Sequence, residues 1–234
     1  MILERFIKKA IKRKVFLDKI EHAYEFKYAL EFAHQALKAE NTKEDKVLIL
    51  DFMLDVIRED LKYDFLTDIF YREEYFDRGV RVPTPFPYSY YDESGRRISI
   101  FERKIGAKKV DLAKECVLTF PWHRERMRKS IKNIGSNEFI YDEYNHFTHY
   151  FSPVNICFVY NGMHSTAAGV GFKKGFIEAP EYDMTGLFEH VHTDGLYWYN
   201  SHNNSKLEDG LLDFRIGIIY ELSKLKYQIE KGLK

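Results

Sequence analysis

Apolar residues recur three or four positions apart over most of the first third of the chain, which is the period of a helix with one buried face. Together these elements predict a helical N-terminal subdomain over residues 1–79. Four helices are expected, over residues 1–14, 18–40, 42–63 and 64–77.

The segment from residue 80 to residue 95 breaks this pattern. Pro83, Pro85 and Pro87 stand at alternate positions, and each proline lacks an N–H donor and restricts the residue before it. Tyrosines and a turn at residues 92–95 follow. We interpret residues 80–95 as a linker between two halves of the chain, and a loop folded over a binding site is the alternative.

Short apolar runs alternate with helical periods after residue 96, which is typical of an α+β fold. The clearest strand runs from Val154 to Tyr160, and a long final helix is expected over residues 205–231. We predict a small mixed sheet within residues 96–234, with the final helix covering the N-terminal helices. Further strands are expected at residues 97–105, 117–120 and 176–179, and further helices at residues 124–134 and 163–170.

The composition limits the classes of function to consider. The 234 residues carry 36 basic and 36 acidic side chains, and this net charge of zero argues against a general nucleic-acid binder while leaving room for a local phosphate pocket. No apolar run approaches the ~20 residues of a membrane-spanning helix, and the charged N-terminus does not resemble a signal peptide. Two cysteines without a paired spacing fit a cytoplasmic protein with no membrane partner.

One strand–turn–helix pattern carries candidate chemistry. An apolar strand is followed by Asn161 and Gly162, a turn that favours positive φ at the glycine, and a helix begins directly afterwards. A helix start presents N–H groups and partial positive charge, to which His164, Ser165 and Thr166 add polar side chains. The pattern predicts a phosphate site at these five residues. In the alternative interpretation, Ser165 or Thr166 only caps the helix.

This stretch resembles the signature of the ParB/sulfiredoxin superfamily, over about residues 115–183. In that superfamily the turn and the helix start cradle nucleotide phosphates, so the resemblance implies that Gly162, His164 and, by position, Ser165 contact phosphate. The matching segments are the strand 156–160, Gly162-Met163-His164, Ala167-Ala168-Gly169, the loop 173–175, the strand 176–179, and upstream the strand 117–121 with the arginine-bearing helix from Arg124.

The sequence also departs from that superfamily at two functional positions. Met163 stands where sulfiredoxin has its catalytic cysteine, so sulfiredoxin chemistry is not expected. Ser165 stands where both families have an arginine, so Arg124, Arg126 or Lys173 would have to supply the missing charge. The implied ligand is a nucleotide, with Mg²⁺ as its expected companion.

Two histidine pairs suggest a competing site. His146 and His149 are three positions apart, which would place them on one helical face, and His190 and His192 are two apart, which would place them on one strand face. Histidines with nearby carboxylates such as Asp142 are typical of zinc or manganese sites. The alternative is that these are ordinary polar histidines in loops.

Three functional hypotheses follow from the sequence. The first is a nucleotide- or phosphate-binding protein, with phosphotransfer or nuclease activity as an option, in which Asp142, His146 and His164 act as acid–base groups or metal ligands. The second is a metal-dependent hydrolase that uses the two histidine pairs. The third is a non-enzymatic module whose helical seams and exposed tyrosines bind a protein partner.

Overall fold

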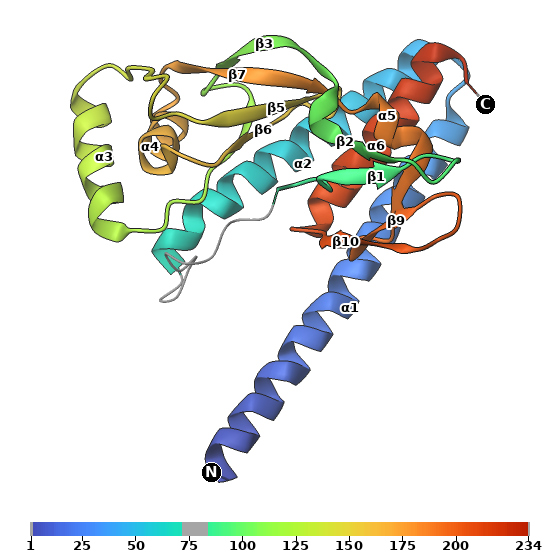
Figure 1. Ribbon diagram of the computed structural model, residues 1–234, viewed down its shortest axis with the longest axis horizontal. Helices are drawn as coiled ribbons and strands as arrows, with labels where there is room; N and C mark the ends of the chain where they lie inside the picture. Colours follow the sequence, from blue (N-terminus) through green and yellow to red (C-terminus); the bar gives the residue numbers. More distant parts are fainter. Residues whose placement is uncertain (1, 72–83, 234) are drawn as a thin grey trace.

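The computed structural model describes residues 2–71 and 84–233, and it confirms an α+β fold in which long helices lie against mixed sheets (Figure 1). None of the helices in these two stretches has an apolar segment long enough to cross a lipid bilayer. The helices are α1 (Ile2–Ala39), α2 (Lys43–Tyr71), α3 (Arg124–Ser136), α4 (Met163–Phe172), α5 (Thr185–His190) and α6 (Phe214–Lys231), with a short 3₁₀ helix η1 (Ile100–Glu102).

The N-terminal helices are longer and fewer than the sequence pattern predicted. The expected helices at residues 1–14 and 18–40 form one helix, α1, because no glycine, proline or capping pair separates them. Likewise α2 continues without a break through residue 71. Residues 72–77 of the expected fourth helix, and the side chains before Lys19, lie outside the described part of the chain.

The main sheet has five strands in the order β3-β7-β5-β6-β4. Its central strand β5 pairs antiparallel with β6 and parallel with β7, and β6 pairs parallel with β4, so the sheet is mixed as predicted. The strands are β3 (Lys104–Asp111), β4 (Cys116–Leu118), β5 (Thr148–Ser152), β6 (Ile156–Val159) and β7 (Phe176–Asp183).

Alternate residues of β6 divide the core into two layers. Ile156 and Phe158 belong to a cluster that α2 and α6 complete, whereas Cys157 and Val159 face the cluster formed with α4. Successive side chains of a strand point to opposite faces, so a strand whose residues are all buried must have helices on both sides. This double cover explains why residues 154–160 form the most apolar strand of the sequence.

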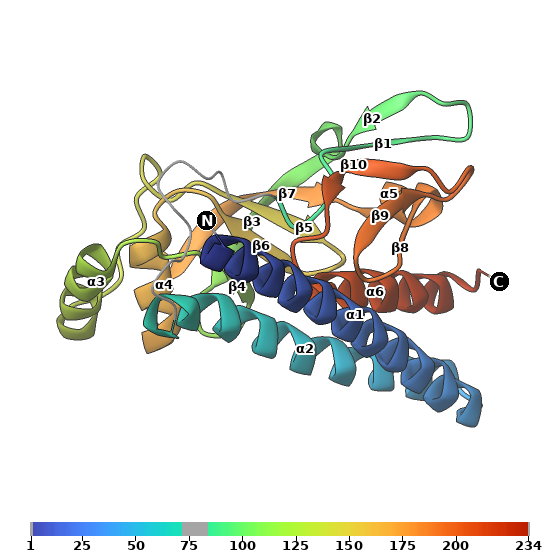
Figure 2. The ribbon, with the colours of Figure 1, turned by 90° about the horizontal axis from the view of Figure 1, so that it is seen from below.

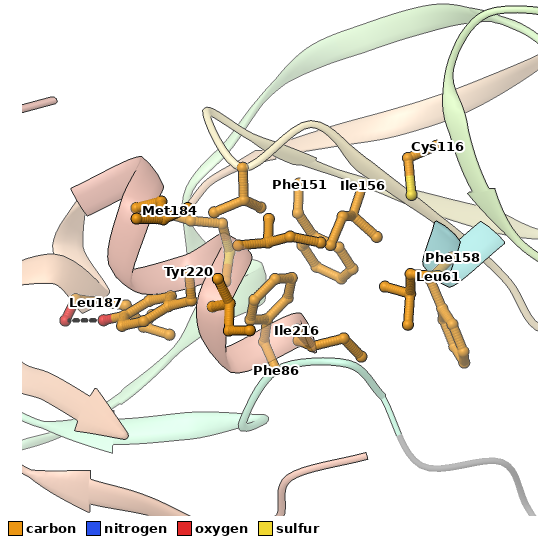
Figure 3. Close-up of a cluster of buried hydrophobic side chains, with 14 of the residues drawn as sticks. Leu61, Phe86, Cys116, Phe151, Ile156, Phe158, Met184, Leu187, Ile216 and Tyr220 are labelled. Carbon is orange, nitrogen blue, oxygen red and sulfur yellow. Dashed lines mark hydrogen bonds between the residues drawn. The ribbon is translucent and has the colours of Figure 1, made fainter. Parts of the chain in front are cut away.

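The described part of the proline-rich segment is packed onto this core. Phe86 is fully buried, and its ring lies 5.2 Å from that of Phe151 and 6.3 Å from that of Tyr220, between centroids (Figure 3). The chain then forms the hairpin of β1 (Ser89–Tyr91) and β2 (Arg97–Ser99), joined by the predicted turn at residues 92–95. Residues 80–83 lie outside the described residues.

The C-terminal part contains a sheet that the sequence pattern did not reveal. It has the order β10-β9-β8, formed by β8 (Val191–Thr193), β9 (Tyr197–Asn200) and β10 (Lys206–Gly210). The final helix α6 therefore begins later than the predicted residue 205. Its cap is Asp213, whose side chain accepts a hydrogen bond from the Arg215 N–H, and Gly232 ends the helix with φ 67°. As predicted, α6 packs against both α1 and α2 (Figure 2).

Candidate functional site

A pocket of about 470 Å³ lies beyond the carboxyl ends of the parallel strands β4 and β6, where the chain enters α3 and α4. This is the edge at which ligands bind in many open α/β sheets, because the helices that follow the strands begin there. Figure 1 shows α3 and α4 side by side at that end of the sheet. The lining residues are Trp122, Arg126, Lys129, Ser130, Asn145, Tyr160, Asn161, Gly162, Met163, His164 and Ser165.

The turn between β6 and α4 requires a glycine. Gly162 has φ 73° and ψ 20°, and a Cβ there would lie 2.6 Å from His146 Cδ2 and 2.8 Å from the Asn145 carbonyl oxygen. No side chain caps the start of α4. The first helical backbone bond runs from the Thr166 N–H to the Gly162 carbonyl at 3.0 Å, so the amides of residues 163–165 precede the helix ladder, and those three residues line the pocket.

The hydroxyl groups predicted to contact phosphate turn inward instead. Ser165 Oγ and Thr166 Oγ1 each donate to the Gly162 carbonyl oxygen at 3.0 Å. Thr166 is fully buried and is not among the described residues that line the pocket, so the structure does not bring its hydroxyl group to the cavity, and its predicted phosphate contact stays a prediction. Ser165 does line the pocket, but its hydroxyl proton is used within the turn.

The His146 side chain forms hydrogen bonds that fix the same turn. Its Nδ1 accepts the Asp142 N–H at 3.0 Å, so the ring proton is on Nε2, which lies 2.9 Å from Ser165 Oγ and donates to it. Burial lowers the pKa of His146 and keeps the ring neutral, against a smaller opposing effect of the Asp142 carboxylate. With its proton on Nε2, His146 cannot act as a general base toward Ser165.

Asp142 likewise has a local structural role. Its carboxylate accepts the Tyr144 N–H at 2.9 Å, and its carbonyl accepts the N–H groups of Asn145 and His146. Neither Asp142 nor His146 lines the pocket. The structure therefore does not place them where their predicted acid–base role would need them.

His164 connects the starts of the two helices. Its Nε2 accepts the His123 N–H at 3.0 Å, while the His123 ring caps α3 by accepting the Arg126 N–H. Burial, with smaller contributions from the charges of Arg126 and His123, lowers the pKa of His164 to about 4. His164 is thus a neutral ring at neutral pH with its proton on Nδ1, for which no hydrogen-bond partner is found within residues 2–71 and 84–233.

The positive charge of the pocket comes from one face of α3. Arg126 and Lys129 line it, and among the described residues that line the pocket none is acidic. The Arg126 guanidinium lies 5.0 Å from the centroid of the Trp122 ring. Arg124, by contrast, donates to the Ile69 carbonyl of α2 at 3.2 Å and is not among the described residues that line the pocket, so its predicted phosphate contact stays a prediction that this pocket does not support.

Four lining residues were missed as binding residues at the sequence level: Lys129, Ser130, Asn145 and Tyr160. The helical spacing of Lys129 and Ser130 from Arg126 could have found two of them, because positions three and four apart share a helix face. Asn145 comes from a loop and reaches the site only through tertiary folding, where its carbonyl accepts Asn161 Nδ2 at 2.7 Å. No local pattern predicts that contact.

The first predicted histidine pair does not share a face. His146 lies in a loop and points to the start of α4, whereas His149 is on β5 among aromatic rings, 4.8 Å from Tyr160 and 4.9 Å from Phe101 between centroids. Burial lowers the pKa of His149 to about 4, and its buried Nδ1 has no hydrogen-bond partner within the described residues.

The second pair is also separated. His190 ends α5 and its Nδ1 lies 2.8 Å from His202 Nε2, whereas His192 is on β8 and stacks on Tyr199 with 5.4 Å between ring centroids. Within residues 2–71 and 84–233, no three His, Cys, Asp or Glu side chains are arranged to hold a metal ion. The predicted convergence of the four histidines on zinc or manganese is therefore not observed.

Comparison with known proteins gives a family but no activity. No curated protein and no solved structure matches the chain. The model of a family of unknown function, DUF6710, matches residues 8–232, which is nearly the whole chain. The protein therefore belongs to the DUF6710 family.

Proposed function

We propose that this protein binds a nucleotide or a related phosphate ligand in the pocket between α3 and α4. The observation that carries the proposal is the convergence of an uncapped helix start with Arg126 and Lys129 in one cavity of about 470 Å³. Backbone N–H groups and the helix dipole attract an anion, and the two cations add full charges. The volume lies within the ~300–1,000 Å³ of small-molecule sites.

The resemblance of residues 115–183 to the ParB/sulfiredoxin superfamily supports the same ligand. It assigns phosphate contacts to Gly162 and His164 on sequence pattern, and both residues line the pocket. We accordingly propose a ParB/sulfiredoxin-like domain for this segment. Because Met163 replaces the sulfiredoxin cysteine, the proposal does not extend to sulfiredoxin chemistry.

Aromatic side chains favour a nucleotide over free phosphate. Trp122 and Tyr160 line the same cavity as the cations, and a base can stack on such rings while its phosphates lie at the start of α4. His164 is the only one of the three predicted catalytic residues in the lining. Phosphotransfer or nuclease activity therefore stays a prediction, as does action in the cytoplasm, where two buried, reduced cysteines are expected.

Titration calorimetry and thermal unfolding test the proposal directly. The protein is titrated with AMP, ADP, ATP, GTP and inorganic phosphate, each with and without Mg²⁺. A ligand present at a hundred times its Kd should stabilise the fold by about 2.7 kcal/mol. A nucleotide should bind more tightly than inorganic phosphate because only the nucleotide reaches the aromatic wall.

Matched arginine variants locate the ligand. Arg126→Ala should weaken nucleotide binding by about ten- to a hundredfold, since hydrogen bonds to charged groups contribute ~1.5–3 kcal/mol. Arg128→Ala is the control, because Arg128 is on the same helix, is exposed, and pairs with Glu125 rather than lining the pocket. Absence of binding by every nucleotide, or equal losses in both variants, would refute the proposal.

A further inference from the structure

Helix α1 carries an exposed apolar stripe on the side turned away from the core. Its buried face holds Phe26 and Ala33, which belong to the cluster completed by α6. The opposite face has a large apolar residue at every fourth position, and the rings of Tyr24 and Tyr28 stack with 6.2 Å between centroids. The exposed fractions are 38% for Ile20, 54% for Tyr24, 61% for Tyr28 and 61% for Phe32.

Helix α2 repeats the pattern. Its buried residues Leu50 and Leu54 face the core, and a second stripe with the same four-residue spacing faces outward. Both helices pack against α6 with their buried sides, so both stripes face away from it (Figure 2). The exposed fractions are 67% for Leu48, 71% for Phe52 and 52% for Val56.

The exposed area is large enough for a stable interface. The four rings of the two stripes expose roughly 500 Å², taking about 200 Å² for a whole ring side chain. The aliphatic members bring the sum close to the ~800 Å² that each partner buries in a standard protein interface. Summed over the two stripes, this apolar area exceeds the ~300–600 Å² of the largest patch on a typical monomer. We propose that a second copy of this chain covers it, with the two α1 helices packed antiparallel across a two-fold axis near residue 29.

The charges beside the α1 stripe are self-complementary about that axis. Lys27 and Glu31 lie next to the stripe, 3.6 Å apart within one chain, and both are exposed. A two-fold axis through residue 29 places position 27 of one copy opposite position 31 of the other, which gives two Lys–Glu pairs across the interface. The same axis places Tyr28 of each copy between Tyr28 and Phe32 of its partner. This matches the common packing of two helices that cross at about 50°, in which the ridges formed by every fourth residue interdigitate.

The surroundings of α2 favour α1 as the centre of the interface. Asp55 and Glu59 flank the α2 stripe, with side-chain exposures of 76% and 49%, and they pair with Arg58 and Lys62 of their own helix. Two α2 stripes placed face to face would bring these carboxylates together, and like charges opposed across an interface weaken it. The α2 stripe therefore forms the edge of the proposed dimer. The pocket between α3 and α4 takes no part in it, so this inference is independent of the proposed function.

Sedimentation equilibrium with charge-swap variants tests the pairing. Wild-type protein should be a dimer at micromolar concentration. Lys27→Glu and Glu31→Lys should each raise the dimer Kd by about tenfold or more, because each turns both cross-interface pairs into like-charge pairs. The double variant K27E/E31K should return the Kd to within about threefold of wild type. A monomeric wild type, or a double variant no tighter than the single ones, overturns the proposal.

Disulfide trapping tests the register. The native Cys116 and Cys157 are buried, so a cysteine introduced on α1 is the accessible thiol. Position 28 lies one residue from the axis, so Tyr28→Cys should cross-link the two copies on mild oxidation. Lys38→Cys is the control, because its two copies would be roughly 25 Å apart along the helices. Equal cross-linking at both positions overturns the two-fold near residue 29.

Discussion

Replacing Gly162 with alanine tests whether the turn before α4 has the left-handed, closely packed geometry on which the pocket depends. The backbone there is left-handed, with φ 73°, and an added Cβ would lie 2.6 Å from the ring of His146 and 2.8 Å from the Asn145 carbonyl oxygen. Neither neighbour can move freely, because His146 is hydrogen-bonded through both ring nitrogens and the Asn145 oxygen accepts the Asn161 side chain.

The expected cost has two parts. The left-handed conformation costs a non-glycine residue about 1–2 kcal/mol. Forcing an extra methyl group into a packed site adds about 1–3 kcal/mol. Gly162→Ala should therefore destabilise the fold by about 2–5 kcal/mol, which lowers the Tm of a chain of this size by roughly 5–15 °C. Nucleotide affinity should fall as well, because the shifted turn misplaces the amides of residues 163–165.

Gly171→Ala in the same helix is the matched control. Nothing lies within 4 Å of a Cβ at Gly171, and its φ is in the ordinary range. Since alanine is a better helix former than glycine by about 1 kcal/mol, this variant should be neutral or slightly stabilised. Urea unfolding of both variants measures the difference. The reasoning fails if Gly162→Ala unfolds within ~0.5 kcal/mol of wild type, or if the two variants change stability by the same amount.

Three further predictions concern stability and accessibility. His164 has a folded pKa of about 4, below its unfolded value near 6.5, so its stabilising effect is complete above pH 6.5 and is lost as pH falls toward 4. His164 should contribute about 1–2 kcal/mol to the loss of stability between pH 7.5 and 4.5, allowing for partial exposure of the ring, and His149, His146 and His192 add to that loss. Urea unfolding should therefore show a pH dependence that is smaller by about that amount in His164→Gln. Arg215→Ala should lower the free energy of unfolding by about 2–4 kcal/mol in the same assay. The change leaves three carboxylates without their shared arginine: Asp60 and Asp64 of α2, and Asp213, which caps α6. Ellman's reagent should label neither Cys116, whose thiol pKa burial raises to about 12, nor Cys157 until urea unfolds the chain.

The elements predicted well from the sequence are those whose signal is local. Within the predicted strand 154–160, residues 156–159 are apolar at successive positions because β6 has helices on both faces. The Asn161-Gly162 turn is specified by the conformation that only glycine adopts without strain. Gly232 marked the end of α6 for the same reason, with φ 67°.

Elements whose stability depends on distant neighbours were missed. Strands β8 to β10 are short and carry few apolar residues, so they resemble loops until Trp198 is seen buried beside Phe86 and Tyr220. The N-terminal boundary of α6 was placed too early because β10 continues directly toward the helix. Pairing between strands far apart in the sequence leaves no periodic signal along the chain.

The predicted histidines and hydroxyl groups show why residue type alone did not locate the chemistry. A neutral imidazole can accept and donate one hydrogen bond each, and His146 uses both capacities to fix Ser165 and the loop behind it. Ser165 and Thr166 in turn hold the Gly162 carbonyl, which directs the backbone at the start of α4.

His146, Ser165 and Thr166 therefore organise the helix start. The groups that line the pocket and would face the proposed ligand are the backbone amides, which the turn pattern predicted, and the two cations of α3, of which only Arg126 was named from the sequence. Backbone amides that folding already holds in place lose no further conformational entropy when a ligand binds. Their ordering therefore does not reduce the affinity. A turn that requires one glycine and is held by the side-chain hydrogen bonds of Asn161, Ser165 and Thr166 is a physical reason to expect binding at that position rather than along the basic face of α3 alone.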